Sequence, residues 1–167
     1  MQIPRERLEI GEILEQLAAT PEQIALLAES PDPELTTAAP DENAWSVNDV
    51  LAHLRACADV WGDSIAAMLS GDQPRIRAVN PRSLFDRTGY RELTFAESLQ
   101  AFADQRVALH GTLNALPETG WAASAIFYGM GSPVERSVRS QSERMALHER
   151  AHIDQIRHTI ATLQRRG

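Results

Sequence analysis

Two histidines one helical turn apart are the residues of this chain best suited to bind a metal ion. His148 and His152 are four residues apart in a segment that predicts a helix, so both rings lie on one face. Met145 and Ile156 continue that face, which indicates that the histidines replace apolar side chains in a buried stripe. Because a buried imidazole without a partner costs about 1–3 kcal/mol, we expect the two rings to share a ligand.

A third histidine, His53, lies on an earlier predicted helix, with Val50 one turn before it and Cys57 one turn after it. A helix bundle can bring this ring to the other two. Three neutral imidazoles that leave coordination positions open are typical of a catalytic divalent-metal site, whereas structural zinc sites fill all four positions. Each histidine taken alone is better explained by packing, and His110 and His158 are expected to be peripheral. Cys57 is expected to be a small buried side chain rather than a ligand.

The segment from His148 to His152 also matches the H-E-x-x-H pattern of zinc proteases. The metzincin extension of that pattern requires glycine where this chain has Gln155. The other completion takes a glutamate from a helix well downstream, but only residues 153–167 follow the second histidine. Zincin folds also contain a sheet that the sequence does not predict, so protease activity is disfavoured.

Four amphipathic helices are predicted to position these residues, over residues 5–29, 46–70, 94–116 and 140–164. Capping boxes beginning at Ser46 and Thr94 mark the starts of two of them. In the first helix, Thr20 and Pro21 are expected to cap a restarted segment and to introduce a kink. No stretch predicts a strand. The expected fold class is therefore all-α, a four-helix bundle that forms a single domain over residues 1–167.

Two long connections, residues 72–93 and 118–139, have no clear periodicity. Connections of this length in a compact domain are usually functional or disordered. The second contains aromatic residues that are candidates for the wall of a pocket, Trp121, Phe127 and Tyr128. Between the connections, the third helix is expected to bury the side that carries Leu99, Phe102, Val107 and Leu113.

The composition excludes several classes of function. All 16 basic residues are arginine, so a Schiff-base lysine and a P-loop lysine are excluded. A net charge of −7 disfavours nucleic-acid binding, which needs a clustered basic surface. The single cysteine excludes an internal disulfide and fits a reducing compartment. No apolar segment is typical of a membrane span or a secretory signal, so we expect a cytoplasmic protein with no membrane or nucleic-acid partner.

The sequence resembles the DinB/YfiT-like superfamily of metalloenzymes. The matching segments are WSVNDVLAHL at residues 45–54 and HERAHIDQI at residues 148–156, and Thr20-Pro21 also fits. The similarity in layout extends over residues 5–165. The resemblance implies a four-helix bundle in which His53, His148 and His152 are the metal ligands. It also implies a range of activities, because the superfamily includes S-transferases that use bacillithiol or mycothiol, a maleylpyruvate isomerase and proposed hydrolases.

The leading hypothesis is a divalent-metal-dependent S-transferase that uses a low-molecular-weight thiol. The alternatives are a metal-dependent hydrolase and a non-catalytic metal-binding stress or interaction protein. Zinc or nickel suits three imidazoles, with manganese and iron as alternatives. Gln155 and Arg144 are the candidate catalytic residues, Gln155 to orient a ligand or substrate and Arg144 to hold a carboxylate of the thiol cosubstrate. Glu149 is not favoured as an activator of water, and Asp49 is interpreted as a helix cap. The expected partners are a small-molecule substrate and, as in other bundles, a second copy of the chain.

Overall fold

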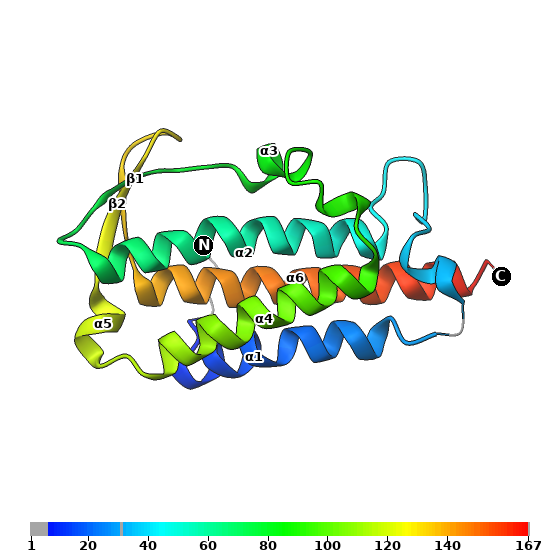
Figure 1. Cartoon of the computed structure of the whole chain (residues 1–167), viewed down its shortest axis with the longest axis horizontal. Helices are drawn as coiled ribbons and strands as arrows, with labels where there is room; N and C mark the ends of the chain where they lie inside the picture. Colours follow the sequence, from blue (N-terminus) through cyan, green and yellow to red (C-terminus); the bar gives the residue numbers. More distant parts are fainter. Residues whose placement is uncertain (1–6, 31, 167) are drawn as a thin grey trace, which may run out of the picture.

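Four long helices lie side by side in the computed structural model, which describes residues 7–30 and 32–166 (Figure 1). They are α1 (Ile10–Leu27), α2 (Val47–Ser70), α4 (Phe95–Asn114) and α6 (Val138–Gln164). Helices α4 and α6 both pack against α1 and α2, and α2 runs antiparallel to α6. The predicted four-helix bundle is confirmed. Within the described ranges, no helix is both long and apolar enough to cross a membrane.

The helix starts follow the predicted capping residues. The Ser46 hydroxyl accepts a hydrogen bond from the Asp49 backbone N–H, and the Asp49 carboxylate accepts one from the Ser46 backbone in return. Thr94 and Glu97 form the same box at the start of α4. Helix α6 begins slightly earlier than predicted, after its N-cap Ser137. The expected start of the first helix at residue 5 lies outside the described residues, and α1 begins at Ile10.

The prediction of a restarted first helix was wrong. Helix α1 is continuous from Ile10 to Leu27, with Pro21 inside it. The Thr20 hydroxyl donates to the Gln16 carbonyl one turn earlier instead of capping a new segment. This back-bond is a common use of a buried threonine within a helix, and it satisfies a hydroxyl that is fully buried.

A small sheet contradicts the expectation that the chain has no strands. It consists of β1 (Arg75–Arg77), β2 (Ser124–Tyr128) and β3 (Val134–Ser137) in the order β1-β2-β3. Strand β2 pairs in parallel with β1 and antiparallel with β3. The fold is thus a helix bundle with a small sheet at one end, and not purely all-α (Figure 1). Strands this short show too few alternations to give a periodic signal.

The connections contain four short helical segments. These are the 3-10 turns η1 (Pro33–Thr36) and η2 (Tyr90–Glu92) and the helices α3 (Pro81–Phe85) and α5 (Glu118–Ala122). The segment of residues 72–93 runs back over α2 and carries α3 (Figure 1). Its far end is held by the Tyr90 hydroxyl, which donates to Asp59 at 2.6 Å, and by the Arg55 guanidinium, 3.8 Å from the Tyr90 ring centre. This anchoring fixes α3 above the middle of α2.

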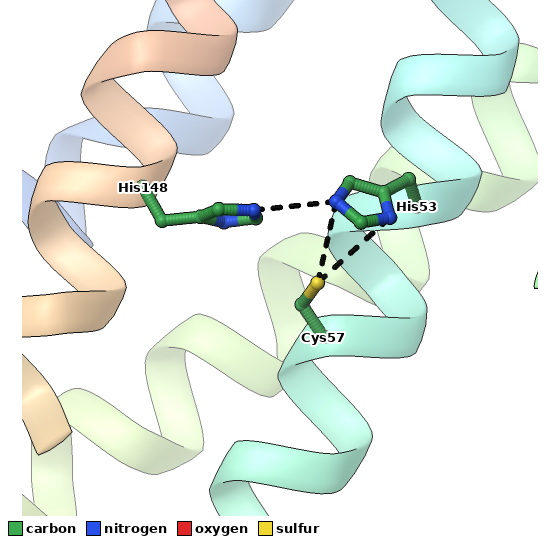
Figure 2. A group of neighbouring side chains, drawn as sticks. All are labelled: His53, Cys57 and His148. Carbon is green, nitrogen blue, oxygen red and sulfur yellow. Dashed lines mark hydrogen bonds between the residues drawn. The ribbon is translucent and has the colours of Figure 1, made fainter. Parts of the chain in front are cut away.

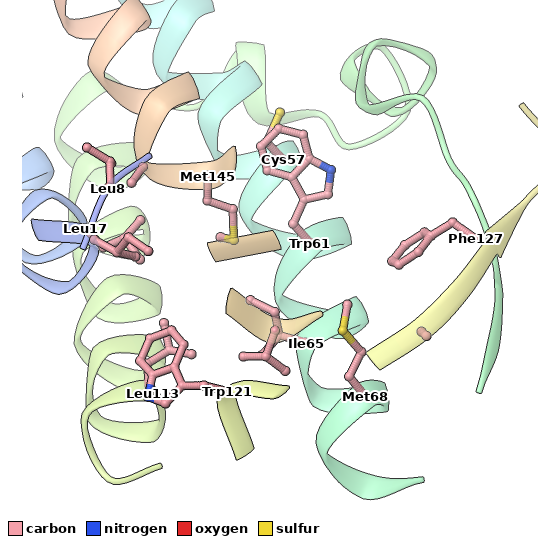
Figure 3. Close-up of a cluster of buried hydrophobic side chains, with 14 residues drawn as sticks. Leu8, Leu17, Cys57, Trp61, Ile65, Met68, Leu113, Trp121, Phe127 and Met145 are labelled. Atoms are coloured by element: carbon pink, nitrogen blue, oxygen red, sulfur yellow. The ribbon is translucent and has the colours of Figure 1, made fainter. Parts of the chain in front are cut away.

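Two clusters of apolar side chains fill the bundle, one toward each end. The cluster nearer the sheet includes Trp61, Trp121 and Met145 (Figure 3). The other is built around Phe102 and Ile156. The expected burial of Leu113 and Phe102 is confirmed and Leu99 is partly buried, but Val107 is 74% exposed because it lies on the outward side of α4.

Candidate metal centre

The structure brings His53, His148 and His152 together between α2 and α6. The Nε2 atom of His148 lies 3.2 Å from Nε2 of His53 and 3.0 Å from Nε2 of His152. The ring centres of His53 and His152 are 4.9 Å apart. Figure 2 shows the His53 and His148 rings reaching toward each other from the two helices. Nε2 of His148 therefore lies between those of the other two rings, one from α2 and one from α6.

Gln155 fixes the orientation of one of these rings. Nδ1 of His152 lies 2.7 Å from the Gln155 side-chain oxygen, which can only accept a hydrogen bond. Nδ1 must therefore carry the proton, and Nε2 of the neutral His152 ring has a lone pair that faces His148. Gln155 is predicted from the sequence to orient a ligand or substrate, and in the structure it contacts a candidate metal ligand, His152.

Burial keeps the histidines neutral. His53 is only 5% exposed, and desolvation, followed by repulsion from His152 and Arg82, lowers its pKa to about 4. Desolvation and repulsion from the other two histidines lower the pKa of His148 to about 3. Burial also lowers the pKa of His152, against the raising effect of its bond to Gln155. Neutral imidazole is the form that binds a metal ion.

Cys57 lies beside the histidines, one turn after His53 on α2. Its sulfur is 3.5 Å from Nε2 of His53 and the side chain is 2% exposed, as expected for a small buried residue. Ligand atoms of His53, Cys57 and His148 lie within 4.8 Å of one another, so these three form a second potential ligand set. Burial and the nearby charge of Glu149 raise the pKa of the thiol to about 12, which favours the protonated form.

Aromatic rings surround the cluster. Trp45 lies 5.1 Å from the His53 ring, and Trp61 meets the His148 ring edge-on at 4.8 Å. Phe85 on α3 stacks on Trp45, so the 72–93 segment covers the His53 side of the site. Neither Trp45 nor Trp61 was predicted to be part of the site. Trp61 had a detectable signal, because it follows His53 by two helical turns on the same face.

A pocket reaches the cluster from one side. It has a volume of about 500 Å³ and is lined by His152 and Gln155 together with Trp45 and Arg82. The expected pocket wall is only partly correct. Phe127 and Tyr128 line a different cavity next to Trp61, and Trp121 is buried in the core.

The remaining candidates lie outside the cluster. Glu149 is 2% exposed and forms an ion pair with Arg106 on α4, at 2.5 Å between oxygen and nitrogen. Asp49 caps α2, as interpreted from the sequence, and it also pairs with Arg91. The Arg144 guanidinium lies 5.2 Å from the centre of the Trp61 ring. His158 is exposed and His110 lines a groove between α1 and α4, so neither reaches the other histidines.

The family model of the DinB superfamily matches residues 16–156, a span that contains all three histidines and Gln155. The chain belongs to the DinB superfamily. Among solved structures, this DinB protein is similar to YfiT from Bacillus subtilis, with a TM-score of 0.75 and 17% identity over 99% of this chain and 94% of that one. YfiT is described as a probable metal-dependent hydrolase with an unusual four-helix bundle topology, and the likeness supports the fold. A comparison with curated proteins found no match.

The lowered pKa values predict that the metal-free protein loses stability in acid. Between pH 6.5 and about 3 the unfolded chain binds more protons at these histidines than the folded chain, so the free energy of unfolding falls as the pH falls. One histidine accounts for a slope of up to about 1.4 kcal/mol per pH unit. The change of the free energy of unfolding with pH is measured by urea unfolding of chelator-treated protein at several pH values. His148→Gln should flatten the slope, whereas Gln100→Leu, which changes no titratable group on α4, should not, and equal slopes in both variants would contradict the prediction.

Proposed function

We propose that this DinB protein is a metal-dependent enzyme whose divalent ion is held by Nε2 of His53, His148 and His152. The observation that carries the proposal is the convergence of these atoms, at 3.2 and 3.0 Å. Nitrogen ligands of a tetrahedral zinc ion, each 2.0–2.1 Å from the metal, are separated by about 3.3 Å. Both distances from Nε2 of His148 therefore fit a single ion shared with its two neighbours.

The charge distribution at this point also supports a cation. Because Gln155 fixes the tautomer of His152, a lone pair of His152 faces the Nε2 atom of His148. His148 can donate one hydrogen bond at most from that atom, while both other Nε2 atoms lie within reach of it. A metal ion satisfies all three lone pairs at once. Zinc and nickel suit imidazole ligands, with manganese and iron as alternatives.

Three protein ligands leave a coordination position for a substrate, which is the arrangement of catalytic sites. Cys57 is close enough to close the site, but its sulfur lies 3.5 Å from Nε2 and 3.9 Å from Nδ1 of His53, so it sits against the ring and not ahead of the Nε2 lone pair. We therefore assign it to the packing beside the ligands. The pocket lined by His152 and Gln155 gives a small molecule access to the open side.

The reaction that we favour is transfer of a low-molecular-weight thiol to an electrophilic substrate. A bound divalent ion would lower the pKa of a coordinating thiol, so that the thiolate is available at neutral pH. In this chain Gln155 orients His152, while Trp45 and Trp61 exclude water from the ligand cluster. The carboxylate that follows His148 along α6, Glu149, is already paired with Arg106. This pairing favours a reaction with an ionised thiol over one in which a carboxylate activates water.

A metal-dependent hydrolase is the second candidate. The likeness to YfiT, which is described as a probable metal-dependent hydrolase, favours it. Metal-bound water can also supply a nucleophile without a carboxylate base.

Elemental analysis of purified, zinc-loaded protein tests the ligand set. We expect one metal ion per chain in the wild type and in His110→Ala, the control at a histidine in the groove between α1 and α4. His53→Ala, His148→Ala and His152→Ala should each lose the ion while circular dichroism shows that the helices remain. Full occupancy in any one of the three would remove that residue from the ligand set.

Titration of cobalt-loaded protein with L-cysteine and with L-serine separates the candidate reactions. A thiol transferase should show a sulfur-to-cobalt charge-transfer band with cysteine and no such band with serine. Failure of cysteine to change the spectrum, combined with ester hydrolysis that His148→Ala abolishes, would replace the transferase with the hydrolase. If neither the charge-transfer band nor ester hydrolysis is observed, the result favours a non-catalytic metal-binding protein.

Gln155 is expected to act as a positioning residue through His152. Gln155→Leu removes the acceptor for Nδ1 and should weaken zinc binding by roughly 10–100-fold, the usual effect of losing a partner behind a metal ligand. Gln155→Glu keeps an acceptor and should retain most of the affinity. Gln100→Leu, the same change on α4 away from the cluster, is the control. Competition with a chromophoric zinc chelator measures the affinities, and equal affinities in both leucine variants would contradict the role.

A further inference from the structure

A second cavity lies on the other side of the histidine cluster, between α2, α6 and the sheet. Its volume is about 280 Å³. Three arginines line it, Arg77 from β1, Arg136 from β3 and Arg144 from α6, and no acidic residue of the described ranges does. This composition is unusual for the chain, in which 23 acidic residues outnumber 16 basic ones. Positive charge is therefore concentrated where the protein is hollowed.

Arg136 occupies a position of β3 where an apolar side chain would be expected. It pairs with Ala125 of β2, and paired residues of antiparallel strands project from the same face. Ala125 and Phe127 on that face are buried against the bundle. The Arg136 guanidinium lies 5.1 Å from the Phe127 ring centre. Burial, followed by repulsion from Arg144, lowers the pKa of Arg136, so two like charges face this cavity together.

Arg144 connects the cavity to the histidines. It lies one helical turn before His148 on α6, and its guanidinium lies over Trp61, the ring that meets His148 edge-on. Trp61 and Arg144 both line the cavity. The Arg77 side chain lies close to the backbone at Gly129, which has a positive φ of 94°. A Cβ atom at Gly129 would lie 3.3 Å from the Arg77 side chain.

The carboxylates of Glu135 and Glu143 line an adjoining pocket together with Arg136 and Arg144, but they form no ion pair with these arginines in the described part of the chain. Glu135 accepts hydrogen bonds from Gln73 and Ser124, and Glu143 accepts one from the Leu8 backbone. Among the described residues, no ion pair involves Arg77, Arg136 or Arg144. Guanidinium groups match the geometry of carboxylate and phosphate, and they bind these oxyanions with paired, charge-assisted hydrogen bonds.

We propose that this cavity binds the oxyanion group, a carboxylate or a phosphate, of the small molecule that reacts at the histidine cluster. Arg136 and Arg144 are its main contacts, and Arg77 closes the open side. That the bound molecule reacts at the histidine cluster rests on the proposed function, whereas the binding of the anion by the arginines does not. Because the cavity adjoins the wall formed by Trp61, an anchored molecule can extend past this ring toward His148. The substrate or cosubstrate is therefore anionic.

Isothermal titration calorimetry at constant ionic strength tests the proposal, with metal-free and zinc-loaded protein. The probes are succinate, inorganic phosphate and succinamide, the neutral analogue of succinate. We expect at least one anion to bind with a Kd of about 1 mM or tighter, and succinamide not to bind. Arg136→Gln and Arg144→Gln should each weaken binding by roughly tenfold or more, the effect expected for a lost hydrogen bond to a charged group. Arg87→Gln, at an exposed arginine outside the cavity, is the control.

The two anions distinguish a carboxylate site from a phosphate site. The absence of saturable heat with both anions up to roughly 10 mM would overturn the proposal, as would equal binding by the arginine variants and the control. Elemental analysis of the same samples measures the metal content separately, so a failure of anion binding can be distinguished from a failure of metal binding. Arginine-dependent anion binding without metal would sustain this inference while the proposed function fails, and metal without anion binding would overturn this inference alone.

Discussion

Three imidazole rings, one buried and two half-buried, lie between α2 and α6 of the bundle, and their polarity constrains what surrounds them. A buried polar group needs a partner, so the rings must satisfy one another, a neighbouring side chain or a shared ligand. Gln155 provides a partner for His152 only, and Nδ1 of His148 is buried without one among the described residues. Nε2 of His148 lies within 3.2 Å of Nε2 of both His53 on α2 and His152 on α6. A cation bound there would give the Nε2 atom of each ring a partner.

The rest of the fold holds these rings and shapes the space around them. Tyr90 and Arg55 hold the 72–93 segment against α2, and the segment in turn places Phe85 over Trp45 beside His53. The small sheet forms the wall of the second cavity and carries Arg136 into it. An acidic chain thus presents a locally cationic cavity beside a neutral ligand cluster, a combination that suits an anionic substrate. The ion pair of Arg106 with Glu149 links α4 to α6 behind the cluster.

Local sequence signals predicted the parts of the structure that depend on local physics. The capping boxes at Ser46 and Thr94 and the spacing of His148 and His152 act within one or two helical turns, and the structure agrees with them. Placing His53 with them needed the resemblance to a family, because its partners are far away along the chain. Packing between distant segments could not be predicted in this way. The three short strands, the exposure of Val107 and the arginine cavity all depend on such contacts, and the resemblance did not include them.

The X-ray absorption spectrum of the zinc-loaded protein tests the central claim most directly, because it reports the ligand atoms themselves. If His53, His148 and His152 hold the ion, the first shell contains nitrogen at about 2.0–2.1 Å, with the outer-shell scattering of three imidazole rings and no sulfur. A sulfur ligand at about 2.3 Å would place Cys57 in the first shell, close the site and contradict the assignment of an open catalytic centre. A spectrum without imidazole scattering would contradict the metal site itself.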